Sequence, residues 1–199
     1  MRKAVWRWAA KQVHRLGLVT TVQCVALSIY SRHMRILGVD CGGEYTGYGV
    51  VQQDALGQLA FVAAGTVRLD RRQPLPVRLK QVFDQLGQVI AQHRPDAVAI
   101  EDVFYAVNVK SALKLGQVRG VAMLAASAAG LQVAEYAPLA IKSAVVGYGR
   151  AEKSQVQQMV TALLRLDSPP DSPDAADALA IAICHLHTCA TLQRQGAAE

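Results

Sequence analysis

Residues 35–51 have the sequence RILGVDCGGEYTGYGVV, and this stretch decides the fold. Two apolar runs separated by a Gly-Gly pair predict a β-hairpin. Asp40 stands where the first strand of the hairpin ends, directly before the glycine turn. Because a glycine turn leaves the backbone open to a close neighbour, Asp40 is placed to hold a metal ion or a phosphate. The alternative is a turn aspartate that accepts hydrogen bonds from its own loop.

The formal charge of +6 comes from the first 33 residues. They contain six Lys or Arg residues and no acid, whereas residues 34–199 contain fifteen basic and fifteen acidic residues. The overall basicity therefore does not by itself indicate a polyanionic partner, and DNA binding has to be argued from local clusters. The four cysteines form no C-x-x-C pair, which favours reduced thiols in a cytoplasm over a disulfide framework or a zinc site.

Residues 1–33 form a basic extension with an apolar stretch at 16–30. This composition resembles a weak signal sequence or a transit peptide, and the stretch is too short and too polar for a membrane span. Met34 stands directly before the first strand, so we expect the natural chain to begin there and little stable structure to precede it. We expect residues 34–190 to form one domain and residues 191–199 to form a tail.

Downstream of the hairpin, strands and helices alternate. We expect a third strand at 58–68, further strands at 96–102 and 132–136, and helices at 76–93, 110–129, 138–146, 151–165 and 174–193. Three consecutive strands followed by alternating helices and strands predict one α/β domain. Its core is a mixed five-stranded sheet with helices on both faces.

Three further acids are candidates for the same site as Asp40. Glu101 follows the fourth strand, and Asp174 and Asp177 begin the last helix behind the predicted N-cap Ser172. A spacing of three puts both aspartates on one helix face. With the first strand central and the fourth beside it, these acids converge with Asp40 at one end of the sheet. The alternative is that acids near a helix N-terminus only favour the helix dipole.

Four gathered acids repel one another unless cations bind among them. Magnesium or manganese suits such a site, because hard divalent ions take oxygen ligands. Two ions about 3.5–4 Å apart could activate a water and stabilise a leaving oxygen in phosphodiester hydrolysis. The acids therefore favour a divalent-metal site that could support this chemistry.

Several blocks together resemble the RuvC family of the ribonuclease H-like superfamily. They are ILGVD at 36–40, TGYGV at 46–50, AIE at 99–101 followed by VF at 103–104, SALKLGQ at 111–117, AEKSQVQ at 151–157 and DAADALA at 174–180. The resemblance implies a homodimeric, magnesium-dependent endonuclease, with manganese able to substitute and two ions per subunit. Such an enzyme nicks two strands of a four-way (Holliday) DNA junction symmetrically and works with the RuvA and RuvB branch-migration proteins.

The resemblance also assigns roles to single residues. It makes Asp40, Glu101, Asp174 and Asp177 the metal ligands. Lys142 and Lys153 match family positions that hold or polarise the scissile phosphate, where a cation offsets developing charge.

The chain departs from the family pattern after Asp40, where Cys41 replaces the common proline and Glu44 adds an acid. We expect activity to survive, with Cys41 an oxidation-sensitive neighbour of the metals. Asp102 adds a second acid beside Glu101. Alternation along the strand points it to the opposite face, which favours a structural role.

DNA contacts are expected from residues around this site. Phe104 and Tyr105 follow Glu101 and are predicted to stack on an unpaired base, the alternative being a core or dimer contact. The basic candidates are Lys110, Lys114, Arg119 and Arg150, although any one basic cluster can be a solvated surface.

Parts of the sequence also resemble two other classes of protein. Asp40 with the following glycines also resembles the phosphate loop of actin-like ATPases and sugar kinases. Those proteins need two such domains, and no second Asp-x-Gly hairpin is present. The other alternative is a related ribonuclease H-like nuclease, or a non-catalytic binder, acting on another branched nucleic acid. The presence of all four acids argues against a non-catalytic version.

Overall fold

The computed structural model describes residues 33–102 and 109–197. The elements are β1 (Met34–Cys41), β2 (Tyr45–Gln53), β3 (Leu59–Arg68), α3 (Leu75–His93), β4 (Ala97–Glu101), α4 (Val109–Ala128), β5 (Gln132–Tyr136), α5 (Pro138–Val146), α6 (Lys153–Leu163) and α7 (Pro173–Ala197). The predicted order of strands and helices is confirmed, with bounds that differ by a few residues.

The five strands form one mixed sheet in the order β3-β2-β1-β4-β5. The strands β1, β2 and β3 pair antiparallel, while β4 runs parallel to β1 and to β5. The strand β1 is therefore central with β4 beside it, as the sequence predicted. This order places the ends of β1 and β4 next to each other.

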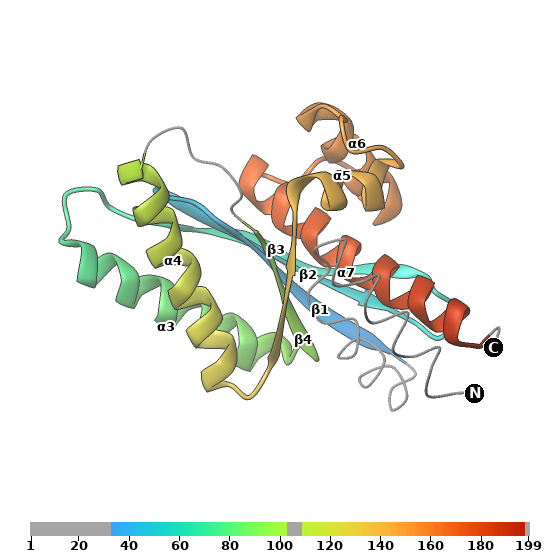
Figure 1. Ribbon diagram of the computed structural model, residues 1–199, viewed down its shortest axis with the longest axis horizontal. Helices are drawn as coiled ribbons and strands as arrows, with labels where there is room; N and C mark the ends of the chain where they lie inside the picture. Colours follow the sequence, from blue (N-terminus) through green and yellow to red (C-terminus); the bar gives the residue numbers. More distant parts are fainter. Residues whose placement is uncertain (1–32, 103–108, 198–199) are drawn as a thin grey trace.

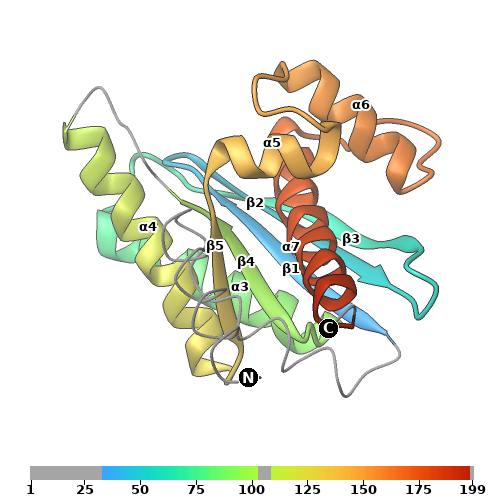
Figure 2. The same cartoon turned by 45° about the vertical axis from the view of Figure 1, so that its right-hand side comes forward.

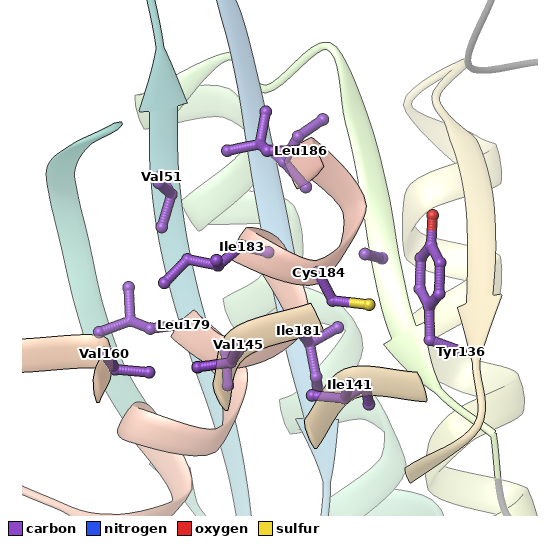
Figure 3. Close-up of a cluster of buried hydrophobic side chains, with 14 of the residues drawn as sticks. Val51, Tyr136, Ile141, Val145, Val160, Leu179, Ile181, Ile183, Cys184 and Leu186 are labelled. Atoms are coloured by element: carbon purple, nitrogen blue, oxygen red, sulfur yellow. The ribbon is translucent and has the colours of Figure 1, made fainter. Parts of the chain in front are cut away.

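Helices cover both faces of the sheet (Figures 1 and 2). One face packs on α3 and α4, and the other packs on α7 with α5 and α6 beyond it. Neighbouring residues of β1 serve the two layers, since Ile36 belongs to the α7 core and Leu37 to the α3–α4 core. Figure 3 shows the α7 core, where Leu179, Ile181 and Ile183 point toward side chains of the sheet and of α5 and α6.

The helix α7 is the central element of the second core. Residues Pro173–Leu192 are long and apolar enough to cross a membrane, but two thirds of that stretch (67%) is buried inside the protein, as expected for a core helix. The helix continues to Ala197, through most of the segment predicted as a tail. Leu192 packs against the core, which explains why the helix extends beyond the predicted end.

Glycines in β1 and β2 let α7 lie directly on the strand backbones. A Cβ atom at Gly38 would stand 2.0 Å from the Ala178 carbonyl oxygen, and one at Gly47 would stand 2.1 Å from the Asp174 carbonyl oxygen. Gly38 pairs with Gly49 across the hairpin, and Gly47 pairs with Asp40. Only residues without a side chain fit under a helix this close. The position of α7 is therefore set by the hairpin.

Candidate active site

The first two acids lie at adjacent strand ends. Val39 of β1 is in register with Ile100 of β4, so Asp40 and Glu101 are the next residues of two parallel strands. The carboxyl ends of neighbouring parallel strands meet at one edge of a sheet, where active sites of α/β proteins commonly lie. The sheet topology therefore brings Asp40 and Glu101 together.

The helix α7 delivers the other two acids to the same edge. Ser172 caps the helix, because its Oγ accepts a hydrogen bond from the Ala175 N–H at 3.0 Å, as the predicted N-cap requires. Asp174 then falls in the first turn, directly above Gly47, which is the residue paired with Asp40. The predicted convergence of the four acids at one end of the sheet is observed.

The pKa values of these acids respond to burial and to one another's charges. Burial, together with the charges of Asp177, Glu101 and Asp174, raises the pKa of Asp40 to about 7, against a smaller lowering by Lys153. Burial and the charge of Asp177 also raise the pKa of Glu101, although two lysines act in the opposite direction. The site is thus an acidic cluster that lacks enough positive charge of its own.

The two lysines come from α5 and α6. Lys153 Nζ lies 2.5 Å from Asp177 Oδ2. Burial acts to lower the pKa of Lys153, but the hydrogen bond to Asp177 and the surrounding carboxylates raise it overall. Lys142 and Lys153 line a cavity of about 160 Å³ together with Glu101 and Asp177. The predicted lysines therefore lie beside the predicted acids.

The donor set fits a hard divalent cation. It consists of carboxylate oxygens, which magnesium and manganese prefer. Burial first, and then repulsion by the other three acids, raise the pKa of Asp40, and a bound cation would offset both effects. Among residues 33–102 and 109–197, no group of three His, Cys, Asp or Glu side chains is already arranged to hold an ion. Lys153 supplies the positive charge beside Asp177 in this arrangement, so an ion would have to draw the carboxylates inward.

Asp102 points away from this cluster. Its carboxylate lies 3.3 Å from the Arg119 guanidinium, which also forms an ion pair with Glu135 of β5. Arg119 Nε donates a hydrogen bond to the Glu101 carbonyl oxygen at 3.2 Å. Arg119 was predicted as a DNA contact, but the structure engages its side chain inside the protein. The sequence offered no signal for this role, because Glu135 is far from Arg119 along the chain.

The other predicted DNA contacts are only partly described. Lys114 on α4 and Arg150 before α6 are exposed. Phe104 and Tyr105 lie outside the described residues, and so does the side chain of Lys110.

Cys41 is buried on the opposite face of the sheet, in the α3–α4 core. Burial and the charge of Asp40 raise the pKa of the Cys41 thiol to about 12, so the reactive thiolate is scarce at neutral pH. The buried thiol therefore argues against the predicted oxidation sensitivity of Cys41. Its neighbour Glu44 is paired with Arg71, and Arg78 donates to the Gly43 carbonyl oxygen. The turn between β1 and β2 is therefore held by Arg71, which lies between β3 and α3, and by Arg78 of α3.

A mixed five-stranded sheet with this strand order and an acidic cluster at its edge defines a nuclease of the ribonuclease H-like class. The family model described as crossover junction endodeoxyribonuclease RuvC matches residues 36–185. The chain belongs to the RuvC family.

Similar proteins agree with this assignment. The chain is 62% identical to the crossover junction endodeoxyribonuclease RuvC of Koribacter versatilis, over 82% of this chain and 99% of that protein. The RuvC structure from Thermus thermophilus superposes with a TM-score of 0.73 at 33% identity, covering 82% of this chain and 97% of that one. A second T. thermophilus structure, described as RuvC in complex with Holliday junction substrate, has a TM-score of 0.73 at 29% identity, covering 79% and 96% of the two chains.

Proposed function

We propose that this chain resolves four-way DNA junctions by symmetric, metal-dependent phosphodiester hydrolysis. The observation that carries the proposal is the convergence of Asp40, Glu101, Asp174 and Asp177 beside two lysines, in a chain that matches the RuvC family over residues 36–185. The T. thermophilus relative described with a Holliday junction substrate supports the same substrate here. The match does not favour a non-catalytic binder or a nuclease for another substrate.

The four acids would hold magnesium, with manganese able to substitute and two ions per subunit. Ions bound there would polarise an attacking water and offset charge on the leaving oxygen. The protein contributes the oxygen ligands and a partly buried cavity that limits competing water. Lys142 and Lys153 face this cavity, so each can donate to a phosphate oxygen and stabilise the charge that develops on it.

DNA would be held outside the cavity by exposed basic residues. Lys114 and Arg150 are available for phosphate contacts, and Lys110 is proposed to add another. Each phosphate contact releases counterions, so junction affinity should fall steeply with salt. Phe104 and Tyr105 are proposed to stack on an unpaired base at the junction.

A homodimer would provide two active sites for two symmetric cuts. The helix α4 offers a face for this contact, because Leu113 and Leu124 are 64% and 57% exposed there. Gly116 and Gly120 lie on the same face, and a Cβ at either would meet no atom within 4 Å. RuvA and RuvB as partners, and a cytoplasmic location, are proposed from family membership.

The test is to incubate the protein with a synthetic four-way junction and with a linear duplex, in magnesium and in chelator. Paired symmetric nicks on the junction alone, and only with magnesium, support the proposal. Asp174→Asn should abolish these nicks, whereas Asp171→Asn, an exposed acid in the preceding loop, should not. Equal cutting of the linear duplex would overturn the proposal.

A further inference from the structure

The Arg119 side chain joins three elements at the edge of the sheet that carries the active site. It extends from α4, donates to the Glu101 carbonyl oxygen at the end of β4, and pairs with Asp102 and with Glu135 of β5. Its side chain is only 18% exposed. The β4–β5 pairing continues at this point, because the Asp102 N–H donates to the Tyr136 carbonyl oxygen at 2.8 Å. Arg119 therefore braces the end of β4.

Arg119 contacts the main chain of Glu101, whereas the carboxylate of Glu101 belongs to the proposed active site on the other side of the sheet. The Glu101 side chain lines the cavity beside α5 and α7, whereas its carbonyl oxygen is held by Arg119 from the α4 side. The main-chain position of a residue limits where its side chain can reach. Holding the carbonyl of Glu101 therefore restricts the positions that its carboxylate can take relative to Asp40 and Asp177.

We propose that Arg119 is a positioning residue for Glu101 and not a DNA contact. For Arg119 to turn outward to a phosphate, it would have to leave Asp102 and Glu135 without their cation, close to four further carboxylates. Removing the cation paired with a partly buried carboxylate is costly, and two such ion pairs would be lost at once. The inference rests on the proposed function, because a positioning role for Arg119 matters only if Glu101 is a metal ligand.

The geometry requires an arginine. One nitrogen of the guanidinium reaches the carbonyl oxygen while another faces the two carboxylates, so the planar fork serves acceptors that lie in different directions. A lysine keeps the charge but has a single nitrogen. Arg119→Lys should therefore restore only part of what Arg119→Met loses.

The test compares Arg119→Met, Arg119→Lys and Lys114→Met, the last being a matched removal of an exposed cation from the same helix. For Arg119→Met we expect cleavage at saturating junction, and Mn²⁺ affinity measured by calorimetry without DNA, to fall about 10- to 100-fold. Junction affinity in chelator should stay within about twofold of the wild type, because no phosphate contact is lost. Lys114→Met should weaken junction affinity and reduce its salt dependence, with Mn²⁺ affinity unchanged.

Two outcomes would overturn the proposal. One is an Arg119→Met protein that binds the junction as weakly as Lys114→Met while keeping wild-type Mn²⁺ affinity. The other is full recovery of cleavage and Mn²⁺ affinity in Arg119→Lys, since charge alone would then suffice. If Arg119→Met does not fold, Arg119→Lys carries the same comparison. A wild-type protein that binds Mn²⁺ but never cuts junctions would instead count against the proposed function.

Discussion

The fold strongly alters the ionisation of Asp40. Its pKa rises from 3.8 to about 7, so between these values the folded protein retains a proton that the unfolded chain has released. The free energy of unfolding of the metal-free protein should therefore fall as pH rises from 4 to 7, by up to about 4 kcal/mol. Glu101 adds a change of the same sign.

Denaturant unfolding in chelator at pH 5 and pH 8 measures this effect. Asp40→Asn should remove most of the pH dependence, and added magnesium should stabilise the wild type more at pH 8 than at pH 5. An equal pH dependence in the wild type and in Asp40→Asn would show that the repulsion lies elsewhere.

Cys41 gives a second prediction at the scale of one residue. The thiols of Cys41, Cys184 and Cys189 are all buried, so in a Cys24→Ser background the folded protein should not react with a thiol reagent. Cleavage should likewise resist mild peroxide, because both modifications need an accessible thiolate. Labelling before and after unfolding provides the measurement. Rapid labelling of one thiol in the folded state would contradict the buried position of Cys41.

At the scale of elements, the close packing of α7 on the β1–β2 hairpin brings Asp174 and Asp177 to Asp40. Gly47→Ala places a methyl group against the main chain of Asp174, so α7 must shift. We expect the free energy of unfolding to fall by about 1–3 kcal/mol. We also expect weaker magnesium binding, so that half-maximal cleavage needs more magnesium, because Asp174 and Asp177 move with the helix. Denaturant unfolding and a magnesium titration measure the two effects.

Gly87→Ala is the matched control, since its added methyl group meets no atom within 4 Å in the middle of α3. It should stabilise the protein by about 0.5–1 kcal/mol through helix propensity. If Gly47→Ala behaved like Gly87→Ala, the hairpin glycines would have no part in positioning α7.

The same elements show what could be predicted from the sequence. Periodicity and turn residues predicted every described strand and helix, and the spacing of Asp174 and Asp177 predicted a shared helix face. The closeness of α7 to the hairpin could not be predicted, because Gly47 meets Asp174 through tertiary packing that leaves no local pattern. The internal role of Arg119 was missed for the same reason, since Arg119 is on the helix α4 and its partner Glu135 is on the strand β5.

At the scale of the whole molecule, the two helical layers have different proposed roles, one in the active site and the other in dimer contact. The layer of α5, α6 and α7 supplies lysines and acids to the cavity. The helix α4 lies on the other side of the sheet (Figures 1 and 2) and has exposed leucines. A dimer formed through α4 would therefore leave both cavities open to DNA. Symmetric junction resolution would then depend on this proposed dimer as well as on each site.

The prediction for the assembly concerns Leu113 and Leu124. Replacing both with Glu should separate the dimer into folded monomers, because each unpaired charge buried in an interface costs about 3–5 kcal/mol. Leu56→Glu is the control, since Leu56 is 86% exposed in the β2–β3 turn, away from α4.

Sedimentation velocity measures the mass of each variant in solution. A plasmid carrying an extruded cruciform reports the cuts, because paired nicks linearise it while single nicks only relax it. The α4 double variant should leave mostly relaxed circles, with its melting temperature and Mn²⁺ affinity unchanged. A variant that remains dimeric, or a monomer that still linearises the plasmid at the wild-type rate, would show that α4 does not couple the two cuts.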